Sequence, residues 1–202
     1  MSLKVASTPI APAWLARSSL DVAPDLLGCQ LVRRWSDGRL LRGTIVETEA
    51  YAPGDPACHA YRRRTERNSV MFGPAGFSYV YMIYGMYHCL NVVTDVDGAP
   101  SAVLIRALEL ETIPEWLNSA GEQARWAAGP GKLCRLFELD RSFSALPLSP
   151  LSSLWLEHRT SQREGALDNP AAVTQTTRIG LTQGADLPWR WYVTASPAVS
   201  KR

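Results

Sequence analysis

Two predicted β-hairpins constrain this 202-residue chain more than any other feature. The first turn signal is Ser36-Asp37-Gly38, and Asp-Gly between two apolar runs is typical of a hairpin. The second is Tyr84-Gly85-Met86, which follows an aromatic, β-prone run. Strands joined by such short turns pair antiparallel. The sequence therefore predicts an α+β domain with a largely antiparallel sheet.

Caps and breakers predict the remaining elements. Ser18 or Ser19 can cap a helix over 21–27, with Gly28 in the stop position. The spacing of Thr112 and Glu115 is that of a capping box and predicts a helix over 113–128. The other predicted elements are a short helix over 132–137 and strands over 29–35, 39–51, 77–83, 87–93, 102–108, 154–157, 175–180 and 189–194.

Length and composition favour one domain over residues 1–202, with a loose N-terminal arm over residues 1–12 that contains Pro9 and Pro12. Hydrophobic residues make up 46% of the chain, yet no run of about 18 apolar residues exists, so no membrane span is expected. The net charge of +2 is much smaller than the positive charge typical of a strongly nucleic-acid-binding domain. A polyanion site would have to be a local patch such as Arg62 to Arg67, although a charge run is also typical of a solvated face.

Metal binding is not expected. The four cysteines are scattered and form no close pair, which predicts reduced, buried thiols of a cytosolic protein. His59 has no second histidine or cysteine at ligand spacing, so a hydrogen-bonding or acid–base role suits it better. Gly129-Pro130-Gly131-Lys132 opens a helix and offers amide groups to an anion, but it lacks the spacing of a nucleotide-binding P-loop.

The candidate site lies on the predicted strand over 39–51. Side chains alternate along a strand, so Ile45, Glu47, Glu49 and Tyr51 share one face. An ionised glutamate beside an electrophile and a water can act as a general base. Spacing alone makes Glu47 and Glu49 equally eligible, and either can also be a solvated strand residue. Because the two are about 7 Å apart at the backbone, a glycosidase pair is possible without being indicated.

Tyrosines form the second candidate feature. They can stack on flat ligands, and cationic rings would gain extra attraction, but aromatic residues also pack ordinary sheets. The members of this set are Tyr51, Tyr79, Tyr81, Tyr84 and Tyr87.

Several co-linear blocks then identify a resemblance that spans nearly the whole chain. They are ETEAY at 47–51, RNSVMF at 67–72, YVYMIYGMYHCLN at 79–91, LIRALE at 104–109, GPGKLC at 129–134, RIG at 178–180 and SPAVS at 196–200. With these blocks the chain resembles the alkyladenine (3-methyladenine) DNA glycosylases of the mammalian-like type.

The resemblance implies a single domain with a curved sheet flanked by helices and a protruding β-hairpin. It implies base-excision repair by a monomeric, monofunctional enzyme without cofactors. That enzyme flips an alkylated purine out of double-stranded DNA and hydrolyses its N-glycosidic bond, leaving an abasic site. The implied location is cytoplasmic, with the chromosomal DNA.

Residue by residue, the resemblance makes Glu49 the general base. Arg106 and the main-chain carbonyl of Ile179 would help to hold the attacking water. The implied base pocket comprises Tyr51, His59, Tyr81 and Asn91, of which Asn91 would crowd the exocyclic amine of guanine. The implied DNA contacts are the wedge Tyr84, its neighbour Met86, and the basic residues Arg64, Arg67 and Lys132.

Departures from the mammalian pattern concern lesion preference rather than the reaction. The segment between Glu49 and His59 is shorter, and His88 stands where an aromatic residue is usual. Two other classes of protein remain alternatives at this point: a module that binds distorted DNA without catalysis, and a sugar glycosidase that uses Glu47 and Glu49.

Overall fold

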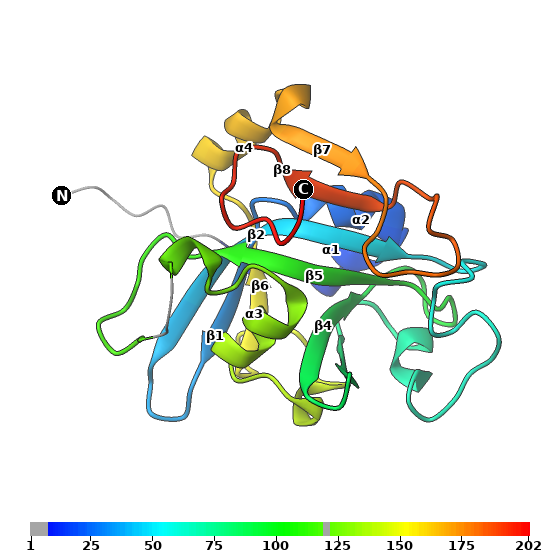
Figure 1. Cartoon of the computed structure of the whole chain (residues 1–202). Helices are drawn as coiled ribbons and strands as arrows, with labels where there is room; N and C mark the ends of the chain where they lie inside the picture. Colours follow the sequence, from blue (N-terminus) through cyan, green and yellow to red (C-terminus); the bar gives the residue numbers. More distant parts are fainter. Residues whose placement is uncertain (1–7, 119–121) are drawn as a thin grey trace.

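The long strand β2 (Leu40–Tyr51) is central to the sheet in the computed structural model, which describes residues 8–118 and 122–202. β2 pairs with β1 (Gln30–Arg34) near its start, with β5 (Ala102–Glu109) along one edge, and with β8 (Arg190–Val193) along the other (Figure 1). The strand order is β3-β4-β5-β2-β1-β6, and β7 (Val173–Thr176) joins through β8. Every pairing between these strands is antiparallel, which confirms the predicted α+β class.

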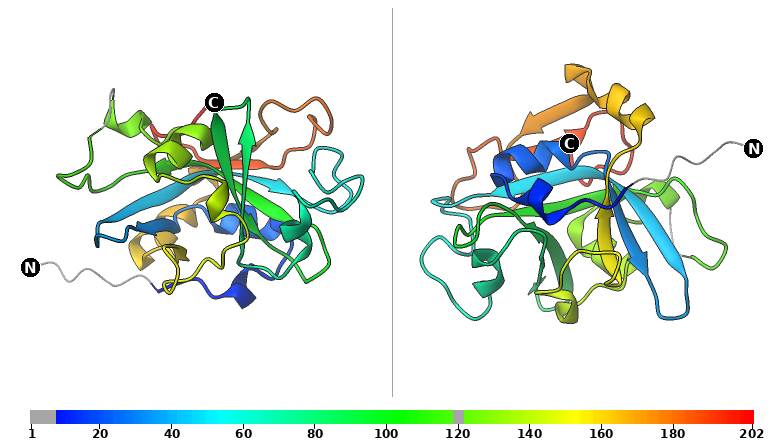
Figure 2. Two further views of the ribbon diagram at one scale, coloured as in Figure 1. Left: turned by 90° about the horizontal axis from the view of Figure 1, so that it is seen from below. Right: turned by 180° about the vertical axis from the view of Figure 1, so that it is seen from behind.

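Both predicted hairpins are confirmed. The β1–β2 turn contains Gly38, whose φ is +86°. β3 (Ser78–Ile83) and β4 (Tyr87–Val93) join through Tyr84 and Gly85, whose φ values of 51° and 69° are the left-handed conformations that a tight two-residue turn requires. The β3–β4 hairpin reaches the edge of the molecule in the left view of Figure 2.

Helices cover both faces of the sheet. α2 (Ser19–Asp25) packs on β2, β5 and β8, as the view from behind in Figure 2 shows, and α3 (Pro130–Leu136) packs on β4 and β5. The predicted cap of α2 is confirmed, because the Ser18 hydroxyl accepts from the Leu20 amide at 3.2 Å and Gly28 follows with φ +81°. The other elements are α1 (Pro12–Leu15), β6 (Leu154–Glu157), α4 (Ser161–Leu167) and the short 3-10 helices at Ser69–Phe72, Gln123–Arg125, Arg141–Phe143 and Pro170–Ala172.

The helix predicted over 113–128 is wrong within the described residues, and 119–121 lie outside them. Only a turn at Leu117 and the 3-10 helix Gln123–Arg125 form there. Tertiary contacts outweigh the local capping signal. Trp116 packs edge-on against Trp35 at 5.3 Å, and Ala128 forms a β-bridge with Ala107 of β5.

Two further expectations change. The loose arm predicted over 1–12 is fixed from residue 8 onward, because Thr8 and Ile10 hydrogen-bond to the chain around β6 and Ile10 is buried; residues 1–7 lie outside the described part. The strand predicted over 175–180 is β7, which ends at Thr176. The residues after it leave the sheet and turn toward the end of β2.

Close packing at Gly43 of β2 gives a testable prediction. A β-carbon there would lie 3.0 Å from Leu108 and 3.1 Å from Phe137, so Gly43→Ala is expected to lower the unfolding free energy by about 1–3 kcal/mol. Gly165→Ala on α4 is the control, since the β-carbon that alanine adds there would have nothing within 4 Å and alanine favours helix. Urea unfolding measures both; equal stability of the two variants would contradict the packing described here.

Candidate active site

The carboxylate of Glu49, near the end of β2, is fully buried and has three donors. Its Oε1 accepts from the Ile179 amide at 2.8 Å and lies 3.2 Å from Nη1 of Arg106. Its Oε2 accepts from the Tyr51 hydroxyl at 2.9 Å. A buried carboxylate that is hydrogen-bonded and paired with a cation can stay ionised, which is what a general base requires.

Glu47, two residues earlier, is equally buried but differently engaged. Its Oε1 accepts from Nε of Arg106 at 3.1 Å, from Nη1 of Arg190 at 2.6 Å and from the Ser200 hydroxyl at 2.9 Å. Its Oε2 accepts from the Ser200 amide at 2.7 Å. These partners occupy both oxygens, so Glu47 has little capacity left for a ligand. As the strand alternation predicts, the side chains of Glu47, Glu49 and Tyr51 lie on the same face of β2.

Arg106 connects the two glutamates from the neighbouring strand β5. The register between β2 and β5 is irregular around Glu47, at the level of Arg106. Burial alone would lower the pKa of this guanidinium, but the adjacent Glu49 and Glu47 carboxylates outweigh it and raise the pKa. Arg106 is therefore a permanent cation shared between the two acids.

Arg178 fixes the loop that delivers the Ile179 amide. Its guanidinium forms a buried ion pair with both oxygens of Asp55 and donates to the Ala50 carbonyl at 2.9 Å. The guanidinium carbon also lies 4.7 Å from the centroid of the Tyr51 ring. Asp55 and the Asp55–Arg178 pair were not predicted as part of the site; the RIG block at 178–180 was the only sequence signal for the loop.

A small pocket opens beside Glu49. Three predicted pocket residues stand close together in it: His59 and Tyr81 have ring centroids 4.5 Å apart, and Tyr51 joins them in the lining. The predicted Asn91 is buried there, and its side chain donates to the Tyr79 carbonyl at 3.1 Å. The full lining is Tyr51, Ala57, His59, Met71, Tyr79, Tyr81, Asn91 and Leu181.

The titratable pocket groups are held neutral. Burial raises the pKa of Tyr51, and the neighbouring Glu49 carboxylate raises it further, so Tyr51 stays a hydrogen-bond donor. Burial, with Arg67 nearby, lowers the pKa of His59. Nδ1 of the His59 ring lies 2.9 Å from the Tyr79 hydroxyl, whose pKa burial raises to about 12. The pocket thus presents uncharged aromatic walls, with one buried carboxylate beyond Tyr51.

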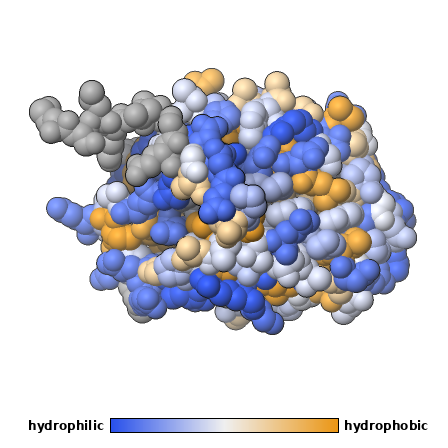
Figure 3. Space-filling view, turned by 90° about the horizontal axis from the view of Figure 1, so that it is seen from above, coloured by the Kyte–Doolittle hydropathy of each residue, from blue (hydrophilic) through white to orange (hydrophobic). Residues whose placement is uncertain are grey.

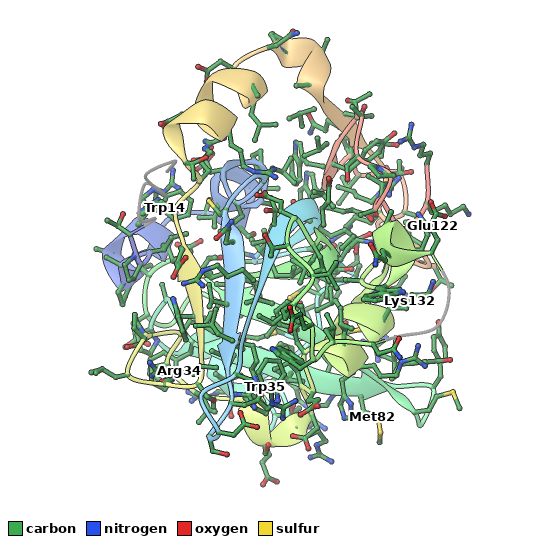
Figure 4. All side chains as sticks on the ribbon, turned by 90° about the vertical axis from the view of Figure 1, so that its left-hand side faces the viewer. Trp14, Arg34, Trp35, Met82, Glu122 and Lys132 are labelled. Carbon is green, nitrogen blue, oxygen red and sulfur yellow. The ribbon has the colours of Figure 1, made fainter. Side chains whose placement is uncertain are left out.

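The predicted DNA-contact residues lie on the surface. Tyr84 is 86% exposed and Met86 66% exposed at the tip of the β3–β4 hairpin, and Met82 and Tyr87 add to the same apolar tip. Figure 4 shows Lys132 of α3 on the same side of the molecule as Met82, with Trp14 on the opposite side. Gly131, the residue before Lys132, packs against Tyr87 of the hairpin.

Arg64 and Arg67 are exposed. The guanidinium of Arg67 lies 5.3 Å from the ring centroid of Tyr81, which lines the pocket, and that of Arg64 lies 5.5 Å from the ring centroid of Phe72. Their loop folds around Asn68, whose side chain donates to the carbonyls of His59 and Arg63. The face above the sheet, in Figure 3, mixes hydrophilic residues with small hydrophobic patches.

Within residues 8–118 and 122–202, no group of three or more His, Cys, Asp or Glu side chains is arranged to hold a metal ion. All four cysteines are free and buried, as predicted. No helix in this described part of the chain has the length and apolar character needed to cross a membrane.

Comparison with known proteins assigns the arrangement to a family. The family model described as methylpurine-DNA glycosylase matches residues 13–197. A protein of Trichodesmium erythraeum is 57% identical over 199 residues, which cover 95% of this chain and 97% of that protein. A protein of Methanoculleus marisnigri is 44% identical over 195 residues, which cover 94% of this chain and 97% of that protein. Both carry the name 3-methyladenine DNA glycosylase.

The buried Asp55–Arg178 pair gives a prediction about stability. Asp55→Ala leaves the Arg178 guanidinium buried without its carboxylate, which is expected to cost about 3–5 kcal/mol of unfolding free energy. Asp37→Ala is the control, because its ion pair with Arg39 is exposed and such pairs contribute little. The two variants are compared by urea unfolding, and similar small losses would show that the buried pair does not hold this loop.

Proposed function

The chain belongs to the methylpurine-DNA glycosylase family, and we propose that it flips alkylated purines such as 3-methyladenine out of duplex DNA and hydrolyses their N-glycosidic bond. As a DNA glycosylase it acts in the repair of alkylated bases. The observation that carries the proposed mechanism is the buried Glu49 carboxylate, which Arg106, Tyr51 and the Ile179 amide hold and which Tyr51 joins to the aromatic pocket.

Glu49 is proposed as the general base for the attacking water. The water oxygen bonds to C1′ of the flipped nucleotide as the bond from C1′ to the purine nitrogen breaks, and the purine leaves with the bonding electrons. The water's proton passes to Glu49, and the product is an abasic site. Positive charge develops on the sugar in the transition state, and an ionised carboxylate stabilises it. Arg106 and the main chain of Ile179 would hold the water.

The aromatic walls favour the damaged base. In the proposed complex Tyr51 lies against one face of the purine, and His59 and Tyr81 lie against the other. A purine alkylated at N3 or N7 is cationic, so electron-rich rings attract it more than they attract a normal base. Its positive charge also activates it as a leaving group, so the proposed chemistry needs no cofactor and little acid catalysis. Asn91, buried beside Tyr79, would crowd the amino group of guanine.

The hairpin tip is proposed as the wedge that replaces the flipped base. Apolar side chains inserted between base steps are an established way to open a duplex. The Tyr84 backbone is in the left-handed region, which is unusual for a bulky residue and is often found at functional sites. Met86 would pack beside it, and Arg64, Arg67 and Lys132 would contact phosphates as the protein binds DNA as a monomer.

The sugar-glycosidase alternative is disfavoured by the engagement of Glu47. A glycosidase needs two carboxyl groups that face the same substrate. Both Glu47 oxygens are bound by Arg106, Arg190 and Ser200, and the residue is completely buried. Only Glu49 adjoins the pocket, through its bond with Tyr51, so one catalytic carboxylate is proposed.

The role of Glu49 predicts a separation of binding from chemistry. Glu49→Gln keeps the shape of the side chain and removes its basicity, so single-turnover base release is expected to fall by roughly 10²–10⁴-fold. The assay uses a duplex with one alkylated purine, followed by alkali to cleave abasic sites. Affinity for that duplex is expected to stay within about threefold, because Glu49 does not form the DNA surface.

The matched control is Glu164→Gln on α4. The Glu164 side chain is exposed, and α4 contributes no residue to the pocket lining. Its base release is expected to equal that of the unaltered protein. A Glu49→Gln protein that binds damaged duplex and still releases base at the normal rate would refute the general-base role.

The wedge predicts a loss of flipping. Tyr84→Ser removes the ring that would fill the vacated stack, and the affinity for a damaged duplex is expected to weaken by roughly tenfold. The fluorescence of a 2-aminopurine placed beside the lesion reports the unstacking. Leu151→Ser is the control, since Leu151 is 97% exposed in a loop before β6. Unchanged affinity and fluorescence in the Tyr84 variant would remove the wedge from the mechanism.

A further inference from the structure

Glu47 accepts four hydrogen bonds from three residues, Arg106, Arg190 and Ser200. It binds Nε of Arg106, while Nη1 of the same guanidinium faces Glu49 at 3.2 Å. A guanidinium is planar and rigid. Fixing Nε on Glu47 therefore fixes the direction in which Nη1 points, and Glu47 sets the orientation of Arg106 toward Glu49.

Arg190 closes a ring of contacts around the two glutamates. Its Nη1 binds Glu47 at 2.6 Å, and its Nε donates to the carbonyl of Thr177 at 3.0 Å. Two residues further along, the Ile179 amide donates to Glu49. Arg190 is also the cross-strand neighbour of Glu49 in the β2–β8 pairing. One side chain thus connects Glu47 to the loop that supplies the Ile179 amide.

The C-terminal segment 196–201 completes this arrangement. Its Ser200 gives both the amide and the hydroxyl to Glu47, and Arg190 donates to the carbonyl of Lys201 at 2.8 Å. Arg125 holds the same segment through the carbonyls of Val199 at 2.6 Å and Ser200 at 3.3 Å. Residues 200 and 201 are therefore part of the hydrogen-bonded cluster around Glu47.

Charge balance gives this ring a second effect. The ionised forms of Glu47 and Glu49 would carry two negative charges, which the two positive charges of Arg106 and Arg190 balance. The titratable and charged side chains that act on the Glu49 carboxylate come from several elements. They are Tyr51 on β2, Tyr81 on β3, Cys89 on β4, Arg106 on β5 and Arg178 in the loop after β7. Arg190 on β8 contacts Glu47. Tyr51, Tyr81 and Cys89 are neutral because burial raises their pKa values, and the charge of Arg178 is compensated by Asp55.

We propose that Glu47, Arg190 and Ser200 are positioning residues for the base-release reaction. They hold Arg106 and the Ile179 amide on Glu49, and Glu47 and Arg190 act as a pair of compensating charges beside it. This inference rests on the proposed role of Glu49, and none of the three residues needs to touch the substrate.

Opposite shifts of the pH profile distinguish this role from a merely structural one. If Glu49 is the general base, the rate of base release falls at low pH as Glu49 is protonated. We call this fall the acid limb of the pH–rate profile. Glu47→Gln removes a negative charge near Glu49, the ionised form becomes easier to keep, and the limb moves to lower pH. Arg190→Gln leaves the Glu47 charge uncompensated, so the limb moves to higher pH. In each variant the acid limb is expected to shift by about half a pH unit or more. Each variant is also expected to release base roughly tenfold more slowly than the unaltered protein at neutral pH.

The experiment measures single-turnover base release from a duplex with one alkylated purine between pH 4.5 and 8, with duplex affinity and thermal unfolding measured in parallel. The double variant Glu47→Gln/Arg190→Gln restores a neutral cluster, and its acid limb is expected to return toward that of the unaltered protein. Asp37→Asn and Arg39→Gln, which break an exposed ion pair on the β1–β2 turn, are controls expected to leave the profile unchanged.

Ser200→Ala keeps every charge and tests positioning alone. Release is expected to slow by at least about threefold with no shift of the limb, because one Glu47 donor is lost while the charges stay. This variant and Arg190→Gln carry the test if Glu47→Gln does not fold.

Limbs that do not move, or that move in the same direction for Glu47→Gln and Arg190→Gln, would overturn the charge pairing. Normal release by Ser200→Ala would overturn the positioning. Absence of release by the unaltered protein would instead refute the proposed function, so the two failures are distinguishable.

Discussion

The arrangement of the site depends on a buried ion-pair cluster at the centre of the sheet. Burying a charge is costly unless it is paired and hydrogen-bonded. β2 carries two carboxylates into the interior, and its neighbours on either edge supply one guanidinium each, Arg106 from β5 and Arg190 from β8. This requirement links strands that are far apart in the sequence and fixes the position of Thr177 and Ile179 in the loop after β7.

The same cluster gives two similar residues different roles. Glu47 is saturated by protein donors, whereas Glu49 adjoins the pocket through Tyr51 and the Ile179 loop. A second buried ion pair, Asp55 with Arg178, joins the loop after β2 to the loop after β7, and the Arg178 guanidinium packs on the Tyr51 ring. The rigid part of the site is thus ionic and the ligand-facing part is aromatic. That division suits the proposed reaction, in which a flat base would enter the pocket without changing the orientation of the Glu49 carboxylate.

The local features of the fold could be predicted from the sequence. These features depend only on residues that are neighbours in the sequence, and all of them occur. They are the Asp37-Gly38 and Tyr84-Gly85 turns, the Ser18 cap and the shared face of Glu47, Glu49 and Tyr51. The helix expected over 113–128 failed because contacts with Trp35 and β5 outweighed its cap. The choice between Glu47 and Glu49 could not be made from spacing, because it depends on Arg190 and Ser200, which lie about 150 residues further along the chain. Only the family resemblance indicated it.

The proposed roles of Glu49, the pocket and the hairpin can be tested together by a crystal structure of the Glu49→Gln protein bound to a duplex with one alkylated purine. We expect an uncleaved nucleotide turned out of the helix, its base between Tyr51 and the rings of His59 and Tyr81, with Tyr84 in the vacated stack. A water is expected between C1′ and the residue 49 side chain, close to Arg106. A base that remains stacked in the duplex, or one bound away from this pocket, would refute base flipping into this site.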